Sequence, residues 1–154
     1  MHQINNMLRS IGTISRSVHT VFNIHCKELG FQRGQFVFLT RICERPGLQL
    51  IELTHLTRVD KTTTTRAVSK LISKGYVVHM RDAHDRRAWN LFPTKKGRSM
   101  YKKIIAEENV EAALCFSNFT VSEKKQLAAL LYKVIGNIDS AWFEIKNYRQ
   151  EVQS

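Results

Sequence analysis

Four consecutive threonines, at positions 62–65, stand between Asp60 and Arg66. Each threonine offers a hydroxyl that donates or accepts hydrogen bonds and a methyl group that packs on apolar surface. Arginine adds a planar guanidinium that suits phosphates and guanine edges. Together these side chains could hold a large polyanion through many short contacts. Because the branched Cβ of threonine loses rotamer freedom in a helix, helix stability alone does not account for this run.

The positive charge of the chain is concentrated around this segment. The whole sequence has a formal net charge of +11 and a pI of about 9.9. Residues 58–103 contain thirteen Lys and Arg side chains against three Asp, so this stretch carries +10 and all other residues together carry +1. Such a concentration of cations favours nucleic acid as the partner. The alternative is a charged surface that only contacts solvent.

Other kinds of chemistry have little support in the residue spacing. Three scattered cysteines form no CxxC pair and six histidines show no HExxH spacing, so neither a disulfide framework nor a metal site is expected. We find no Gly-rich phosphate loop and no nucleophile elbow, and we therefore expect no enzyme activity and no cofactor. No apolar run approaches the roughly 20 residues that span a bilayer, and no signal peptide is recognisable. The sequence thus predicts a cytoplasmic protein without membrane partners.

The threonine run lies at the start of one of two short predicted helices. The apolar spacing in residues 48–59 predicts a compact helix, and Asp60 is a candidate N-cap for a second helix over 60–74. Gly75 is suited to end that helix because glycine takes the left-handed conformation easily. Two short helices joined by a few residues form a helix-turn-helix.

Two predicted strands follow at once. Residues 76–81 and 88–92 are rich in β-branched and aromatic side chains, whereas residues 82–87 between them are polar and charged. This pattern predicts a β-hairpin with a long tip. A hairpin directly after a helix-turn-helix is the arrangement called a winged helix, and we expect its lobe to span residues 33–93.

The short side chains of the second helix suit entry into the major groove of DNA. Threonine lets the backbone approach, and it offers its hydroxyl to phosphates or base edges and its methyl group to thymine. The side chains expected to contact DNA here are Lys61, Thr62, Thr63, Thr65, Arg66 and Lys70. Thr64 is expected to face inward or sideways. The alternative is that the threonines merely tolerate a solvent-exposed face.

Arg86 and Arg87 lie near the tip of the predicted hairpin. An arginine on a projecting loop is suited to a narrow, electronegative minor groove. Asp85 beside them is an acid at the tip of a strongly basic module. It either positions an arginine or is an ordinary surface carboxylate.

Long amphipathic helices are predicted on both sides of the helix-turn-helix and its hairpin. They cover residues 5–28, 33–43, 94–116 and 120–150, and the last begins with a capping-box sequence, TVSE. The predicted fold is therefore mostly α, an α+β winged helix of about six helices with a β-hairpin wing.

The first and last helices carry apolar stripes longer than a small lobe can cover. Burial of apolar surface is worth about 25 cal/mol per Å², so these stripes favour a partner, and we expect residues 1–32 and 94–154 to form a homodimerisation region. The side chains expected at the dimer interface are Ile4, Met7, Ile11, Ile14, Leu131, Val134, Ile138, Ala141 and Ile145. The alternative is that the two helices pack only on each other within one chain.

The stretch ELTHLTRVDKTTTTRAVSKLISKGYVVHMRDAHDRRAWNLFPTKKG, residues 52–97, resembles the DNA-binding core of the MarR/SlyA family of bacterial transcription regulators. DAHDRR matches the D-x-R-D-x-R-like wing, and FPTKKG matches the step into the next helix. Two departures are His84, where arginine is common, and Pro93, where leucine is common. The first could alter one backbone contact of the wing, whereas the second only reshapes a strand end.

The resemblance implies more about the site. It implies that Arg87 enters the minor groove, with Asp85 holding its guanidinium, and that the chains dimerise through their terminal helices. Family members often bind small amphipathic or phenolic ligands, and others respond through a reactive cysteine. The neighbours of Cys26, His25 and Lys27, could lower its pKa, although a buried structural cysteine is the other interpretation.

Three phenylalanines, Phe22, Phe36 and Phe38, could line an effector pocket or belong to the core. The sequence thus predicts a homodimeric, sequence-specific transcription regulator, a repressor that binds a palindromic operator in double-stranded DNA and responds to a small-molecule effector. The alternatives are a non-specific or architectural nucleic-acid-binding protein and a cysteine-based redox sensor of the same family.

Overall fold

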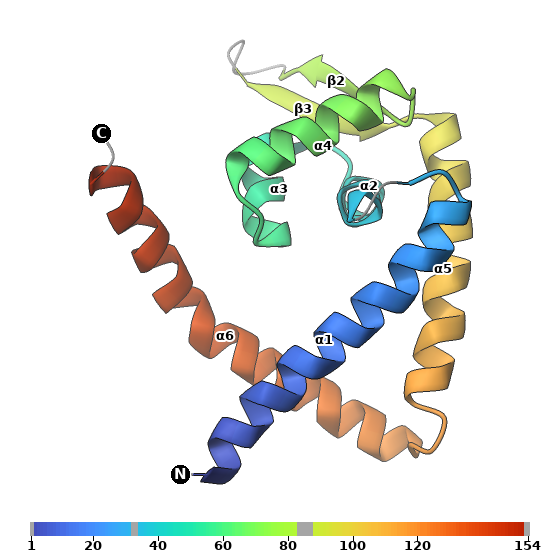
Figure 1. The fold of residues 1–154 in the computed structure, drawn as a ribbon. Coiled ribbons are helices and arrows are strands. Elements are labelled where there is room, and N and C mark those ends of the chain that lie inside the picture. The colour runs from blue at the N-terminus through green and yellow to red at the C-terminus, as the bar shows by residue number, and fades with distance from the viewer. Residues whose placement is uncertain (1, 32–33, 83–87, 153–154) are drawn as a thin grey trace. The chain divides into compact units, whose positions relative to one another are not determined.

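A computed structural model describes residues 2–31, 34–82 and 88–152. The chain divides into two compact units, residues 1–112 and 113–154. The helices are α1 (His2–Glu28), α2 (Gln35–Glu44), α3 (Leu50–Thr57), α4 (Lys61–Ser73), α5 (Lys95–Cys115) and α6 (Val121–Val152), and the strands are β1 (Leu48–Gln49), β2 (Val77–Arg81) and β3 (Trp89–Pro93) (Figure 1). The predicted fold class, mostly α with a winged helix, is confirmed.

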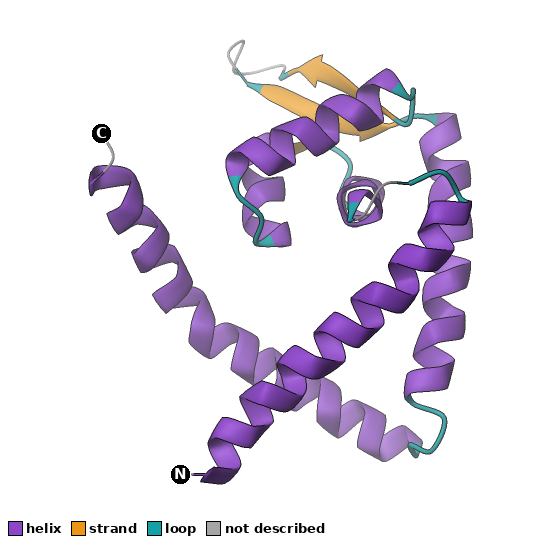
Figure 2. Cartoon of the chain, viewed as in Figure 1, coloured by secondary structure: helices purple, strands orange, loops and turns teal. Residues whose placement is uncertain are grey.

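The three strands form an antiparallel sheet in the order β1-β3-β2, with α4 lying along it (Figure 2). Leu48 pairs with Leu91, and at the other edge Arg81 pairs with Trp89. The prediction of one helix over 48–59 is wrong at its start. The Gln49 amide donates to the Glu52 carboxylate (2.8 Å) in a capping box, so the helix begins at Leu50. Leu48, the residue before the cap, pairs with β3 in the sheet.

A tight turn joins α3 to α4. Arg58 adopts a left-handed conformation (φ 56°), which ends α3. Asp60 then caps α4 as predicted, because its carboxylate accepts a hydrogen bond from the Thr63 amide (2.9 Å). Gly75 follows the helix with φ 72°. The predicted range of 60–74 is therefore correct to one residue at each end.

The core extends beyond the predicted lobe. Leu39, Leu53 and Leu71 are fully buried at its centre, and Phe22 of α1 and Ile104 of α5 join the same cluster. The core of the predicted lobe, residues 33–93, therefore includes side chains from before and after it. Short helices and a small sheet leave an apolar surface uncovered, and the C-terminal half of α1 and the first turns of α5 bury it.

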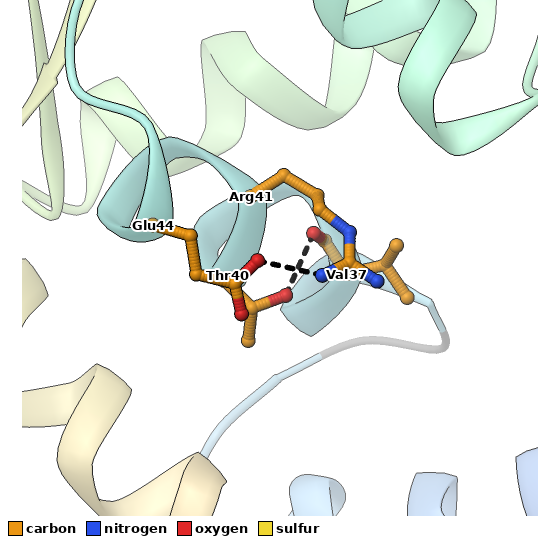
Figure 3. Close-up of polar contacts among 4 residues, drawn as sticks. All are labelled: Val37, Thr40, Arg41 and Glu44. Atoms are coloured by element: carbon orange, nitrogen blue, oxygen red, sulfur yellow. Dashed lines mark hydrogen bonds and ion pairs between the residues drawn. The ribbon is translucent and has the colours of Figure 1, made fainter. Parts of the chain in front are cut away.

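Helix α2 supplies much of this core and satisfies its own polar groups. The hydroxyl of the buried Thr40 donates to the Val37 carbonyl (2.9 Å), and Arg41 pairs with Glu44 (2.6 Å) on the outer face (Figure 3). The helix was predicted to begin at Arg33, which lies outside the described residues.

Helices α5 and α6 both begin at predicted caps. Thr94 accepts a hydrogen bond from the Gly97 amide (3.0 Å) at the start of α5. Thr120 accepts one from the Glu123 amide (3.2 Å), and its own amide donates to the Glu123 carboxylate (2.7 Å). The hydrogen bonds from Thr120 lower the pKa of Glu123. No helix in the described ranges is long and apolar enough to cross a membrane.

Candidate nucleic-acid interface

The outward face of α4 presents a narrow polar stripe. At about 100° per residue, Thr62, Arg66 and Ser69 lie within one sector, and all three are exposed. Thr64 lies on the opposite side with 0% of its surface exposed, as predicted, and its hydroxyl donates to the Asp60 carbonyl (2.9 Å). The four threonines therefore divide into three exposed side chains and one that belongs to the core.

The other predicted contacts lie on the two flanks of this stripe. Thr63 and Lys70 are exposed on one flank, and Lys61 and Thr65 are exposed on the other. The Thr65 hydroxyl donates to the Lys61 carbonyl (2.7 Å). All six side chains predicted for this helix are thus accessible to a partner.

The C-terminal end of α4 is fixed by side chains from elsewhere in the fold. Lys96 donates to the Lys74 carbonyl (2.7 Å), and Thr94 donates to the Gly75 carbonyl (2.7 Å). Lys74 in turn donates to the carbonyl of Gly30 at the end of α1 (2.9 Å). Cations near a helix C-terminus stabilise its carbonyls. Two lysines of the basic segment therefore position the helix, a role that the charge count alone did not reveal.

The wing is closed at its base. The Asp82 amide donates to the Ala88 carbonyl (3.0 Å), and the Asn90 side chain donates to the Asp82 carboxylate (2.7 Å). Four residues discussed for the tip, His84, Asp85, Arg86 and Arg87, lie outside the described residues. Their roles stay predictions.

A pocket of about 430 Å³ opens beside α4. Its lining comes from α1, α2 and the residue before it, the end of α3, the turn before α4, and α4: His19, Gly34, Gln35, Val37, Phe38, Thr57, Val59, Thr63, Arg66, Ala67 and Lys70. Of the three phenylalanines considered for such a pocket, only Phe38 is in this lining, and Phe22 and Phe36 pack edge to face in the core (4.4 Å between ring centroids). Arg66 belongs both to the lining and to the outward stripe of α4.

Cys26 lies in the core with 1% of its surface exposed. Burial, together with the nearby Glu108, Glu107 and Glu111, raises the pKa of its thiol to about 12. The suggestion that its sequence neighbours lower this pKa is wrong, because burial and, after it, the carboxylates of α5 raise the pKa. Among the described residues, no group of three His, Cys, Asp or Glu side chains could hold a metal ion.

Comparisons with known proteins agree with this geometry. The MarR family model matches residues 31–89. The HTH-type transcriptional regulator YybA of Bacillus subtilis strain 168 is 36% identical over 143 residues, which cover 93% of this chain and 95% of the relative. A MarR protein from Peptoclostridium difficile is 48% identical, with a TM-score of 0.84 over 91% of this chain and 92% of the other.

A further similar structure contains DNA. It is a MarR family transcriptional regulator from Listeria monocytogenes complexed with 26mer DNA, 36% identical, with a TM-score of 0.88 over 91% of this chain and 93% of the other. These similar proteins are transcription regulators rather than enzymes. A chain with this winged helix, this exposed stripe on α4 and these relatives belongs to the MarR family of transcription regulators.

Proposed function

We propose that this regulator acts as a homodimeric repressor that places α4 in the major groove and the wing, residues 82–87, in the adjacent minor groove of a palindromic operator. The observation that carries the proposal is the division within the threonine run. Thr64 is committed to the core, whereas Thr62 and Arg66 stand exposed at the centre of the outward face. The similarity to a regulator complexed with 26mer DNA supports the same arrangement.

The dimer would form through the apolar stripes of the terminal helices. In one chain, Met7 and Ile14 of α1 and Ile138 and Ile145 of α6 expose about 60% of their surface each. Three more side chains of the predicted interface are exposed to a smaller fraction: Ile11, Leu131 and Val134. Ala141 is also exposed, and the side chain of Ile4 lies outside the described part. Apolar rows of this length are costly in water, and a two-fold partner would cover them.

An effector would act through the pocket beside α4. A volume of about 430 Å³ is within the range of small-molecule sites, about 300–1,000 Å³. Arg66 is shared between the pocket and the DNA-facing stripe, and it is suited to an anionic or phenolic ligand. A ligand that engages this guanidinium would remove it from DNA, so ligand and operator would weaken each other's binding by the same factor.

The experiment that tests the DNA-binding proposal is selection of bound duplexes from a random-sequence library, followed by footprinting of the enriched sequence. We expect two inverted half-sites whose centres are about one helical turn, or a multiple of it, apart. Occupancy should then block transcription in vitro from a promoter that overlaps the site. Equal affinity for the enriched and scrambled duplexes would contradict the proposal and favour an architectural protein.

A further inference from the structure

The surface between α4 and the sheet holds two adjoining hollows. One, of about 240 Å³, lies between the Thr65–Ser69 side of α4 and the His79–Trp89 side of the sheet. The other, of about 460 Å³, lies between Lys61 at the start of α4 and Trp89. Trp89 and Leu50 line both hollows, which together form the groove between α4 and the sheet.

Trp89 packs against two side chains of β2. Its ring centroid lies 4.7 Å from that of His79, with the two rings tilted by 56°, and 5.2 Å from the Arg81 guanidinium carbon. Arg81 and Trp89 are cross-strand partners, and His79 shares their face because side chains alternate along a strand. The cation–π contact fixes the direction of the guanidinium.

These three side chains are open to a partner. Trp89 exposes 45% of its surface, and His79 and Arg81 are also exposed. Within the described ranges, no side chain fills either hollow. An exposed tryptophan beside the Arg81 guanidinium, with Lys61 lining the neighbouring hollow, offers apolar contact and positive charge at one place.

The position of the groove identifies its occupant. A helix in the major groove and a wing in the adjacent minor groove must straddle the one sugar–phosphate strand that separates those grooves. That strand has to pass between α4 and the strands that support the wing. This step depends on the function proposed above, in which α4 and the wing enter neighbouring grooves.

We propose that Trp89, Arg81 and His79 form a contact platform for this sugar–phosphate strand. The exposed edge of the indole packs on deoxyribose, and Arg81, oriented by the indole, donates to a phosphate. Lys61 contacts the strand from the opposite wall of the groove. The wing thus contributes to affinity through its base, independently of the tip residues that the sequence pointed to.

Trp89 fluorescence tests the platform directly. The chain has two tryptophans, so Trp142→Phe leaves Trp89 as the only one. Titration of this variant with the duplex enriched in the selection should change the emission and saturate at the same concentration as anisotropy of the labelled duplex. Full binding by anisotropy with unchanged emission would overturn the platform while leaving the proposed function intact. Failure of the unmodified protein to prefer that duplex would instead overturn the proposed function.

Two variants separate the roles within the platform. Arg81→Ala should reduce the slope of log affinity against log salt by about one, as expected for the loss of one phosphate contact. Trp89→Ala should weaken binding by about fivefold to tenfold, and Trp89→Phe, which keeps a ring under the guanidinium, should recover most of it.

The matched controls lie nearby but away from the groove. Met80 is exposed on the opposite face of β2, and Arg98 is exposed near the start of α5. Met80→Ala and Arg98→Ala should leave affinity and salt slope unchanged. If Arg98→Ala lowers the slope as much as Arg81→Ala does, or if Arg81→Ala leaves it unchanged, the platform is not the contact. Circular dichroism melts of each variant establish that it is folded.

Discussion

At the scale of single residues, neighbouring side chains of one type do different work. Thr62 and Thr64 are two positions apart on one helix, yet the first is exposed and the second is fully buried. Helical periodicity was enough to predict this difference, because the apolar positions of α4 define which side faces the core. Which parts of the fold lie beside each flank became visible only with the sheet and α2 in place.

This division gives a prediction for the threonine run. Thr64→Val should lower the free energy of unfolding by about 1 kcal/mol, since a buried hydroxyl loses its hydrogen bond to the Asp60 carbonyl. It should leave the operator affinity of the folded protein unchanged. Thr62→Val should have the opposite pattern. Urea denaturation and fluorescence anisotropy measure the two quantities, and an affinity loss for Thr64→Val at full folding would count against the assignment.

Gly97 is required by a close approach between backbones. A Cβ at this position would lie 2.1 Å from the Tyr76 carbonyl oxygen. Gly97→Ala should therefore destabilise the protein by about 1–3 kcal/mol or more, because α5 must move away from the start of β2. Gly136→Ala is the matched control, since a Cβ there meets nothing within 4 Å. Its urea midpoint should stay the same or rise, because alanine favours the helix.

The buried thiol of Cys26 gives a pH dependence of known sign. Its pKa is raised from an ordinary 9.0 to about 12, so the folded state holds the proton more tightly than the unfolded state. The contribution of this pKa shift to the free energy of unfolding is fully present below about pH 9 and is lost as the pH rises towards 12. Urea unfolding at stepped alkaline pH should show this loss, and the slope should be smaller in Cys26→Ala. Near neutral pH, alkylation should modify the exposed Cys115 well before Cys26.

At the scale of elements, long-range pairing limited what could be predicted. The helices, caps and hairpin carry local signals and were found to within a few residues. β1 carries none, because two residues have no measurable periodicity and Leu48 continues the apolar spacing of α3. Its strand pairing depends on Leu91, far along the chain. The contribution of α1 to the core was missed for the same reason, since an amphipathic stripe does not specify which element covers it.

The ends of α4 give a prediction at this scale. Lys96 and Lys61 both belong to the basic segment, but Lys96 donates to a backbone carbonyl and Lys61 is exposed beside the groove. Lys96→Met should lower the urea midpoint and leave the salt slope of DNA binding unchanged. Lys61→Met should reduce that slope by about one with little effect on stability. An equal slope change for both would mean that charge count alone governs binding.

At the scale of the whole molecule, the proposed dimer makes the prediction with the largest effect. Leu131→Asp and Ile138→Asp would each place a carboxylate in the apolar stripe of α6, and each should weaken dimerisation by about 30-fold or more. Sedimentation velocity should show monomers. These monomers should bind the operator without cooperativity. Ala129→Asp, on the other side of the helix, adds the same charge and should remain dimeric. If the variant that carries both Leu131→Asp and Ile138→Asp remains a dimer, α6 is excluded as the interface.

The closed base of the wing has a consequence for how this regulator could diversify. Asp82 is joined to Ala88 and Asn90 below the tip, and β1 pairs with β3 beyond them. Because these contacts lie outside residues 83–87, we expect changes in the length or sequence of that segment to leave the register of the sheet and the position of α4 unaltered. Paralogues with different residues at the wing tip would then differ in operator preference while they keep the same helices and sheet.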